Sequence, residues 1–450
     1  MVVGANGEDT GGSGAGAAYV FTRGVPSGNW TEVAKLQASD KQAADYFGFS
    51  VSTSADGSTV VVGAYREATG GAFAGAAYVF TRGGGAGGSS NYTQVAKLQA
   101  SDKQAWDFFG YSVSTSADGS TVGVGAYGES TGGSWAGAAY VFTRGGAGGS
   151  TSYTEVAKLQ ASDKQANNNF GVSVSTSADG STVVVGAHGE STGGSWAGAA
   201  YVFTRGGGGG GSSNYTQVAK LMASDKQAYD NFGYSVSTSA DGSTVVVGAK
   251  GEDTGGAYAG AAYVFTRGGG GCGSGSYTQV TKLMASDKQA NDQFGWSVST
   301  SADGSTVVVG AYKEDTGGTY AGAAYVFTRG GGAGGSSYTQ VAKLQASDKQ
   351  ANDYFGSSVS ISGDGRTIAA GAYGGDGSAA GASMLEGLDP NSEEYKQMSE
   401  MLNATGMLTT PNKAPPSSSD NPGTKAANSG LFVAIGISTL LVCYNSASSY

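Results

Sequence analysis

Histidine and cysteine are nearly missing from this sequence. His188 is the one histidine among 450 residues, and the two cysteines are Cys272, in a glycine-rich stretch, and Cys443, in an apolar one. A single imidazole excludes a multi-histidine metal site, and a histidine-based catalytic centre is not expected. Because the two cysteines lie in such different settings, the sequence predicts neither a disulfide framework nor a zinc site.

Proline and charged residues are also scarce. There are 6 prolines, and charged residues make up 13% of the chain with a formal net charge of -10. No basic stretch supplies an electrostatic footprint for nucleic acid, so no nucleic-acid partner is expected. Glycine is abundant, with 81 residues, but apolar runs such as VVV at 60–62 persist between the glycines. The glycines therefore lie between strands that are expected to be ordered, and they do not indicate disorder.

The sequence repeats itself almost from end to end. Three segments recur in fixed order: FGxSVSTSADGSTVVVGA, AGAAYVFTRGG and YTQVAKLQASDKQA. The Phe-Gly steps, spaced 61 or 62 residues apart, are Phe47, Phe109, Phe170, Phe232, Phe294 and Phe355. A fixed period of this kind indicates an array of one supersecondary unit.

One repeat reads as four short antiparallel strands without a helix. Residues 110–115 alternate in polarity, and the Ala-Asp-Gly at 117–119 is typical of a tight hairpin. Further strands are expected at 121–126, 138–144 and 153–161. We name them A, B, C and D in chain order. A single sheet of this kind cannot bury two apolar faces, so the sheets must stack, and the repeat length favours propeller blades over a solenoid.

The paired FG and GA steps resemble the FG-GAP repeat. The Gly-Ala steps begin at Gly4, Gly63, Gly125, Gly186, Gly248, Gly310 and Gly371. The resemblance covers about residues 1–383 and implies the seven-bladed propeller found in integrin alpha chains. It also implies that Phe packs between blades and that Gly allows close backbone approach. The proline of the family motif is replaced by Asn6, Tyr65, Tyr127, His188, Lys250, Tyr312 and Tyr373.

The fold predicted for residues 1–384 is thus all-β, a propeller of four-stranded antiparallel blades. The strand count of 25 or 26 fits neither six nor seven complete blades. We predict seven blades with one or two incomplete, and six blades are the alternative. No signal peptide is visible, and Met1 reads as a truncated start.

Antiparallel order places the D–A and B–C loops at one end of every blade. These loops carry most of the acidic residues: Asp40, Asp45, Asp102, Asp107, Asp163, Asp225, Asp230, Asp287, Asp292, Asp348 and Asp353, with Glu8, Asp9, Glu67, Glu129, Glu190, Glu252, Asp253, Glu314 and Asp315. They also carry aromatic residues that vary between repeats: Phe73, Trp106, Trp135, Trp196, Tyr229, Tyr258 and Tyr320, together with Tyr46 and Tyr354. An acidic, aromatic ring predicts a ligand-binding face. The alternative is that the rings cover blade edges and the Asp residues cap turns.

The opposite end carries the A–B turns and three N-x-Thr sequons. These sequons, with a fourth near the C-terminus, give the glycosylation candidates Asn29, Asn91, Asn214 and Asn403. The resemblance implies calcium in the A–B loop, but Ser-Ala-Asp-Gly-Ser offers one carboxylate, such as Asp118, where the family uses three. We therefore predict no metal site and no cofactor.

Chemistry concentrated in one repeat would need residues that break the pattern. His188 is the one such residue noted, and it reads as a surface substitution. The sequence therefore predicts that the chain is not an enzyme.

The composition changes beyond residue 384. Residues 385–404 predict a short helix, 405–429 a Pro/Ser-rich linker and 430–447 an apolar membrane-anchor candidate. A transmembrane span and a GPI signal are both compatible with this tail, and a buried strand or a gene-model artefact are the alternatives. The tail predicts membrane attachment and a location at the cell surface.

Three functions follow from these patterns. The first is a cell-surface adhesion-type propeller that binds an extracellular protein or glycan through the D–A and B–C loops. The second is a structural wall or matrix repeat without a specific ligand. The third is a propeller enzyme that acts on carbohydrate.

Overall fold

The computed structural model describes residues 1–24, 28–83, 91–145, 152–206, 214–268, 276–330 and 337–374. This part of the chain contains 25 β-strands and no helix. The strands form seven antiparallel sheets, in each of which spatial order follows chain order. Five sheets have four strands, the first has three and the last has two.

The strands recur with nearly constant bounds. The first sheet is β1 (Val2–Ala5), β2 (Ala17–Arg23) and β3 (Trp30–Leu36). The second is β4 (Ser50–Thr53), β5 (Thr59–Ala64), β6 (Ala76–Arg82) and β7 (Tyr92–Leu98). The third is β8 (Ser112–Thr115), β9 (Thr121–Ala126), β10 (Ala138–Arg144) and β11 (Tyr153–Leu159). The fourth is β12 (Ser173–Thr176), β13 (Thr182–Ala187), β14 (Ala199–Arg205) and β15 (Tyr215–Leu221).

The remaining sheets continue the series. The fifth is β16 (Phe232–Thr238), β17 (Thr244–Ala249), β18 (Ala261–Arg267) and β19 (Tyr277–Leu283). The sixth is β20 (Ser297–Thr300), β21 (Thr306–Ala311), β22 (Ala323–Arg329) and β23 (Tyr338–Leu344). The last is β24 (Phe355–Ile361) and β25 (Ile368–Ala372).

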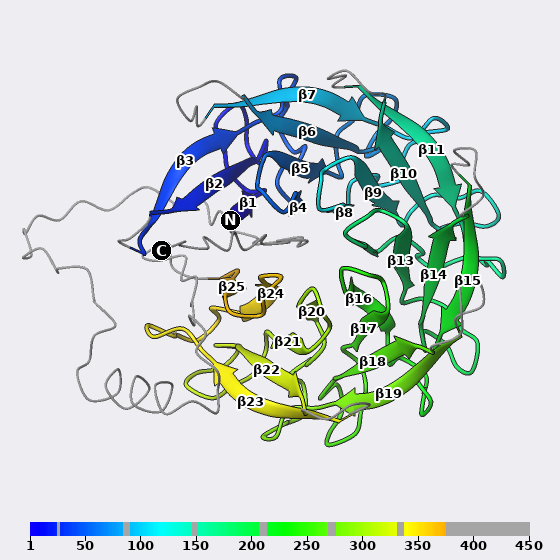
Figure 1. Cartoon of the computed structure of the whole chain (residues 1–450), viewed down its shortest axis with the longest axis vertical. Coiled ribbons are helices and arrows are strands. Elements are labelled where there is room, and N and C mark those ends of the chain that lie inside the picture. Colours follow the sequence, from blue (N-terminus) through cyan, green and yellow to red (C-terminus); the bar gives the residue numbers. More distant parts are fainter. Residues whose placement is uncertain are drawn as a thin grey trace, which may run out of the picture.

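The sheets are arranged as blades around a common axis, with strand A innermost and strand D outermost (Figure 1). The predicted all-β propeller of four-stranded antiparallel blades is confirmed. Counted by its repeats the propeller has six units, and counted by the sheets of the described residues it has seven. The two counts differ because, within those residues, the first sheet contains strands B, C and D and the last contains A and B.

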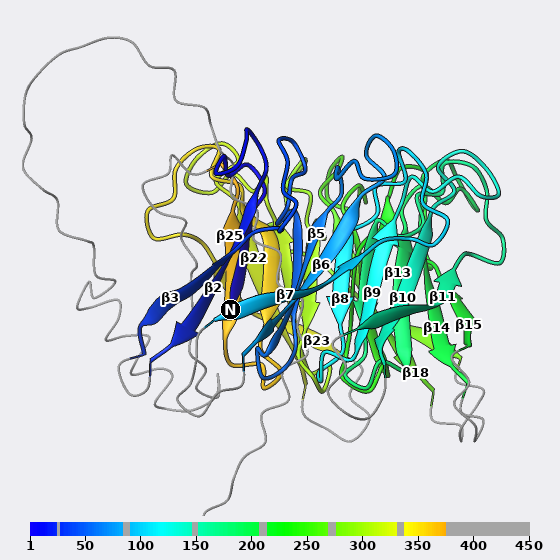
Figure 2. The same cartoon turned by 90° about the horizontal axis from the view of Figure 1, so that it is seen from above.

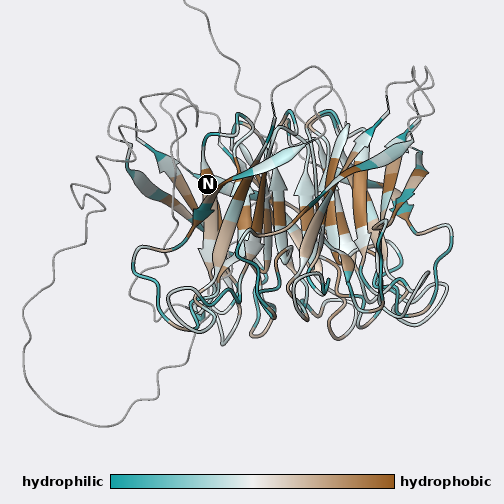
Figure 3. Ribbon diagram, turned by 90° about the horizontal axis from the view of Figure 1, so that it is seen from below, coloured by the Kyte–Doolittle hydropathy of each residue, from teal (hydrophilic) through white to brown (hydrophobic). Residues whose placement is uncertain are grey.

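Phenylalanine and glycine have the packing roles that the repeat predicts. Phe109 is fully buried between the second and third sheets, 5.5 Å from the Tyr140 ring and 6.0 Å from the Phe142 ring. A Cβ on Gly63 would lie 2.0 Å from the carbonyl oxygen of Gly110 in the next sheet. Adjacent sheets therefore meet backbone to backbone at these glycines. Apolar residues fill the middle of the strands, and polar residues lie toward both rims (Figure 3).

The serines of the S-V-S motif in strand A join neighbouring sheets. Ser50 Oγ donates to the carbonyl oxygen of Gly110 at 2.9 Å, and Ser52 Oγ accepts the amide of Thr115 at 3.0 Å. These bonds recur at later steps and satisfy edge-strand groups that face the axis. In the last sheet, the equivalent Ser358 Oγ is buried without a partner in the described part of the chain.

The predicted segments 385–404, 405–429 and 430–447 lie outside the described residues, as do Cys272, Cys443 and Asn403. Within the ranges that the structure describes, there is no helix of the length and hydropathy needed to cross a membrane.

Candidate recognition face and channel mouth

The D–A and B–C loops share one rim of the propeller, at the top of Figure 2, as antiparallel order predicts. We call this rim the loop face. Its loops are bonded to each other: Trp106 N–H donates to the carbonyl oxygen of Ala72 at 2.8 Å, and Phe108 N–H donates to that of Phe73 at 3.0 Å. Each B–C loop thus supports the D–A loop that follows it, which fixes the backbone beneath the aromatic side chains.

The predicted aromatic residues all lie on the loop face, and four are substantially exposed. The exposed fractions are 52% for Trp106, 37% for Trp196, 57% for Tyr229 and 45% for Tyr258. The partly buried members are Phe73, Trp135 and Tyr320. Phe73 contacts Trp106 edge to face at 4.6 Å, so neighbouring loops present their rings together.

Every one of these aromatic residues has a left-handed backbone. The φ angles of Phe73, Trp135, Trp196, Tyr258 and Tyr320 lie between 56° and 58°, and those of Trp106 and Tyr229 are 72° and 70°. This conformation costs a bulky L-residue about 1–2 kcal/mol. The same loop positions in other repeats hold smaller residues that are not aromatic: Gly14, Ala44, Asn167, Asn291 and Asn352. Of these, glycine and asparagine accept a positive φ readily. The fold therefore does not require aromatic side chains there.

The prediction of an exposed acidic ring is wrong for most of its carboxylates, because they are neutralised within the blades. In the third sheet, Lys158 Nζ pairs with Glu129 at 2.9 Å and with Asp102 at 2.6 Å, and Tyr140 Oη donates to Asp102 at 2.8 Å. Glu129 is 2% exposed. Asp102 belongs to the preceding D–A loop, so the network also joins two sheets. Equivalent lysines in strand D of the complete sheets are Lys97, Lys220, Lys282 and Lys343.

The network favours the charged forms of Asp102 and Lys158. Burial raises the pKa of Asp102, but the hydrogen bonds from Lys158 and Tyr140 outweigh it and bring the pKa below its usual value. Burial lowers the pKa of Lys158, yet its bonds to Asp102 and Glu129 raise the net value. Burial and the bond to Asp102 raise the pKa of Tyr140 far above its ordinary range. These groups act as an internal brace.

A second set of aspartates is buried in the D–A loops. Asp107 is 3% exposed and accepts the amide of Gln104 at 2.7 Å. Burial raises its pKa to about 6, and the nearby Glu129 adds to the effect. The equivalent residues with the same shift are Asp45, Asp230 and Asp292. The third repeat has a buried Asn168 at this position.

The remaining acidic residues of the B–C loops are exposed, and they stabilise turns by accepting hydrogen bonds from backbone amides of the same loop. Asp253 accepts the amide of Tyr258 at 2.8 Å, and Asp315 accepts that of Tyr320 at 2.7 Å. Turn capping, the alternative reading of these residues, therefore describes them, and the aromatic side chains dominate what the loop face presents.

Sequence reasoning missed an inner group of aromatic residues where the central channel opens on the loop face. This group, which we call the channel mouth, is Phe49, Tyr65, Tyr111, Tyr127, Tyr234, Trp296 and Tyr312. Tyr111 contacts Phe49 at 4.7 Å and Tyr127 at 4.5 Å, and Trp296 contacts Tyr234 at 4.7 Å. Most of these residues line a channel cavity of about 650 Å³ whose walls are the Ser and Val residues of strand A.

A signal for the channel mouth is present in the sequence. Its residues occupy two repeat positions that change from copy to copy, one directly after each Phe-Gly step and one directly after each Gly-Ala step. The second position is the one that holds proline in the family motif. The antiparallel pairing of strands A and B brings the two positions of one sheet together, as in the 4.1 Å contact of Trp296 and Tyr312. The ring arrangement then joins successive sheets, as in the contact of Phe49 with Tyr111.

His188 lies at the same Gly-Ala position and is not a simple surface substitution. Its ring is 5.3 Å from the Trp196 ring and 5.6 Å from the Tyr234 ring. Burial lowers its pKa to about 3, with a further contribution from Lys250. The imidazole is therefore neutral at physiological pH.

The A–B turns use their single carboxylate locally. Asp118 Oδ1 accepts Ser116 Oγ at 2.6 Å and the amide of Ser120 at 2.9 Å, which closes the turn. Across the described ranges, no group of three or more His, Cys, Asp or Glu side chains converges. The sequon residues Asn29, Asn91 and Asn214 are exposed at the starts of β3, β7 and β15.

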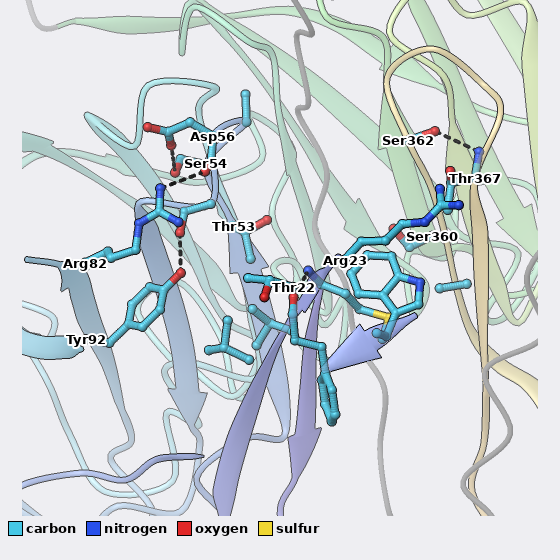
Figure 4. A pocket seen from close by; sticks show the side chains of 18 residues that line it. Thr22, Arg23, Thr53, Ser54, Asp56, Arg82, Tyr92, Ser360, Ser362 and Thr367 are labelled. Carbon is cyan, nitrogen blue, oxygen red and sulfur yellow. Dashed lines mark hydrogen bonds between the residues drawn. The ribbon is translucent and has the colours of Figure 1, made fainter. Parts of the chain in front are cut away.

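A second cavity, of about 570 Å³, lies between the incomplete first and last sheets. Figure 4 shows Ser360, Ser362 and Thr367 of the last sheet on one side and the turn of Ser54 and Asp56 on the other. Tyr92 Oη donates to the carbonyl oxygen of Gly57 at 2.6 Å. Burial lowers the pKa of the Met1 ammonium to about 6, and this group donates to the carbonyl oxygen of Phe21.

Solved structures similar to the propeller include enzymes. A periplasmic gluconolactonase of Pseudomonas aeruginosa is 15% identical with a TM-score of 0.51, covering 86% of this chain and 94% of its own. A putative 6-phosphogluconolactonase of Bacteroides fragilis is 12% identical with a TM-score of 0.52, covering 85% and 93%. The hydrazine synthase of Kuenenia stuttgartiensis is 12% identical with a TM-score of 0.50, covering 82% and 92%.

The prediction that the chain is not an enzyme, which rested on the lack of residues that break the repeat, is wrong as an exclusion, because solved structures with this fold include a gluconolactonase. At these identities the likeness shows the fold alone. No curated protein sequence matches the chain significantly.

The sequence itself matches the FG-GAP repeat over most of its length. The matched residues are 30–80, 92–142, 153–203, 215–265, 277–327 and 338–384. Each match starts on the outer strand of one sheet and continues into the inner strands of the next, as the Phe and Gly contacts between sheets require. The chain therefore belongs to the FG-GAP repeat family.

Proposed function

We propose that this chain is an extracellular binding propeller that recognises a protein or a glycan through the aromatic residues of the loop face. The observation that carries the proposal is the left-handed backbone of Phe73, Trp135, Trp196, Tyr258 and Tyr320. Strained residues of this kind cluster at functional sites, where the strain is offset by the rest of the fold.

The exposed aromatic residues are also costly in water. Trp106, Trp196, Tyr229 and Tyr258 each expose more than a third of their surface. Asparagine or glycine in their place, as at Asn167 or Gly14, would lower both the strain and the exposed apolar area. Aromatic side chains supply large contact area with few rotatable bonds, which favours their use as binding anchors.

An extracellular location is part of the proposal. The exposed sequons at Asn29, Asn91 and Asn214 lie away from the loop face, where glycans would leave the binding surface open. Attachment to a membrane by residues 430–447 would present the loop face outside the cell.

The test measures binding of the purified full chain to arrays of defined glycans and extracellular matrix proteins. A double variant, Trp135→Asn with Trp196→Asn, keeps a residue that accepts the left-handed backbone. Loss of two aromatic anchors should weaken binding about 100-fold or more, since one such anchor contributes roughly 2 kcal/mol. The thermal midpoint should stay the same or rise, because the strain is relieved.

A matched control removes exposed apolar side chains elsewhere. Val218 and Val341 are 43% and 39% exposed on outer strands, and Val218→Asn with Val341→Asn should leave binding unchanged. Equal affinity of wild type and the tryptophan variant would reject the loop face as the binding surface. Absence of any bound ligand would favour a structural repeat, and turnover of gluconolactone would favour an enzyme.

A further inference from the structure

Three cations at the channel mouth break the charge pattern of the repeat. Arg66, Lys250 and Lys313 each follow a Gly-Ala step, at positions where other repeats have Gly, Tyr, Asn or His. The lysines of strand D are all paired with two carboxylates in the complete sheets, as Lys158 is. Among the described residues, Arg66, Lys250 and Lys313 form no ion pair with any carboxylate.

Lys250 lies between two aromatic rings of the channel mouth. Its Nζ is 3.4 Å from the centre of the Tyr234 ring and 4.2 Å from that of the Trp296 ring. The ring faces attract a cation and hold it in place. Burial, and to a lesser degree Lys313, lowers the pKa of Lys250 to about 7, and the ring faces oppose this shift because they favour the charged form. An arriving anion would favour it further.

A second polar group beside Lys250 also lacks a partner. His188 Nδ1 is buried and makes no hydrogen bond among the described residues. The His188 ring contacts Tyr234, the residue on which Lys250 rests. A buried ring nitrogen without a partner is unfavourable unless water or a ligand completes its bonding.

Arg66 repeats the arrangement on another sector of the ring. Its guanidinium carbon is 4.5 Å from the centre of the Tyr46 ring and 5.3 Å from that of Tyr65. Arg66, Tyr65 and Tyr234 line the same channel cavity of about 650 Å³. Arg66 thus lines the cavity itself, and Lys250 rests on Tyr234 and Trp296, which line it from another sector.

The carboxylates nearest to these cations are already engaged. Glu67, which follows Arg66, pairs with Lys97, and Glu252, two residues after Lys250, pairs with Lys282. Asp253 accepts the amide of Tyr258, and Asp230 accepts the amide of Gln227. Among the described residues, these cations therefore have no carboxylate within ion-pair distance, although the whole chain has a net charge of -10.

We infer that the channel mouth binds a carboxylate-bearing carbohydrate, with Arg66 and Lys250 contacting the carboxylate and the aromatic rings contacting the sugar. The inference rests on the proposed function and names the ligand class for that face. Flat aromatic rings match the apolar faces of sugar rings, and isolated cations supply charge-assisted contacts to single acidic groups.

A peptide fits the loop face less well. Recognition of an extended peptide uses free backbone donors and acceptors, as at an open sheet edge. Here, the D–A loop amides donate to B–C loop carbonyls, as Phe108 N–H does to Phe73. The repeated sectors suit a polymer of repeating sugar units, for which several weak contacts add up.

The test uses the full chain and an oligogalacturonate probe, with a neutral galactan oligosaccharide of equal length beside it. Titration calorimetry and tryptophan fluorescence, to which Trp296 contributes, report binding. We expect tighter binding of the acidic probe, an affinity that falls with added salt, and a loss of about tenfold or more in Lys250→Gln and in Arg66→Gln. Lys250→Arg keeps the charge and should restore most of the affinity.

Lys103→Gln is the matched control. This lysine lies on the same face and donates to Gln99 Oε1 at 2.7 Å, so its loss should leave the affinity within twofold. Wild-type affinity in Lys250→Gln and Arg66→Gln would overturn the anion site even if the tryptophan variant loses binding. A poly-glutamate peptide that binds as tightly as the oligogalacturonate would overturn the carbohydrate assignment. If neither the acidic nor the neutral probe binds and the arrays show no ligand, both the anion site and the proposed binding function are rejected.

Discussion

The blades and the channel mouth differ in how closely they follow the repeat. In the blades, the same contacts recur at each step: Phe109 packs between sheets, Gly63 meets Gly110, and Lys158 joins Glu129 and Asp102. At the mouth, equivalent positions hold Tyr65, Tyr127, His188, Lys250 and Tyr312. The backbone conformation repeats from sheet to sheet in the blades and at the channel mouth. The fold therefore requires the repeated side chains of the blades, while it permits those of the channel mouth to vary.

This difference separates stability from recognition within one molecule. Substitutions in the repeated contacts should change the free energy of unfolding, while those at the mouth should change binding with little effect on stability. Three predictions test this separation, beyond the two binding experiments on the loop face.

The largest effect is expected at a glycine contact between sheets. A Cβ on Gly186 would lie 1.9 Å from the carbonyl oxygen of Gly233. This oxygen belongs to the backbone, so it cannot move aside as a flexible side chain could. Gly186→Ala should therefore destabilise the chain by more than about 4 kcal/mol or prevent folding, as measured by chemical denaturation. Gly57 has φ +67 and nothing within 4 Å of an added Cβ, so Gly57→Ala should cost only about 1 kcal/mol. Similar losses in the two variants would contradict the close-contact role.

A smaller loss is expected when a strand D lysine is removed. Lys158→Met leaves Glu129, which is 2% exposed, without its cation. Removing one partner of a buried ion pair costs about 3–5 kcal/mol. Lys103 bonds to Gln99 and to no carboxylate among the described residues, so Lys103→Met should change the free energy of unfolding by less than about 1 kcal/mol. If Lys158→Met also lowers the free energy of unfolding by less than about 1 kcal/mol, the ion-pair network does not stabilise the blade.

The smallest effect concerns pH. Burial raises the folded-state pKa of Asp107 to about 6, above the unfolded value of 3.8. The folded state then binds the proton more tightly, so the contribution of Asp107 to stability is present at pH 4 and is lost as the pH rises through 6. Asp107→Asn imitates the natural Asn168 and should reduce this loss by about 2 kcal/mol.

Urea denaturation of wild type and Asp107→Asn at pH 4 and pH 7 measures this difference. Other titrating groups, such as His188 and Met1, are common to both proteins and cancel in the comparison. The aspartates with lowered pKa values, such as Asp102, titrate below this window. An identical pH dependence in the two proteins would show that Asp107 is not protonated preferentially in the folded state.

Local patterns were sufficient to predict the blades. Alternation at 110–115, the Asp-Gly turn and the AAYVFTR run predict β8, β9 and β10, and strand order places the D–A and B–C loops on one face. These features depend on residues that are close together in the sequence, so they can be predicted from local patterns.

The charge state of the loop face depended on contacts that local patterns do not show. Lys158 meets Asp102 across 56 residues, because the D–A loop that carries Asp102 lies beside strand D of the next sheet. The same holds for Tyr111 and Tyr234, each of which affects the pKa of the other although a whole sheet separates them in sequence. Reading the recurring Lys, Glu and Asp as one set would have suggested internal pairing.

The uniform pairing of strands C and D has a consequence for assembly. Ala77 opposes Leu98, Ala139 opposes Leu159 and Ala200 opposes Leu221, each with a bulge between the same Val and Phe. A strand D that docks one blade too far during folding would therefore find matching neighbours in the correct alignment. Only a longer loop opposes such an exchange, and each doubling of loop length adds just ~0.6 kcal/mol. A propeller in which a strand D has paired with the wrong blade would keep the native contacts inside its sheets. It would differ from the native propeller only in the order of the side chains around the channel mouth.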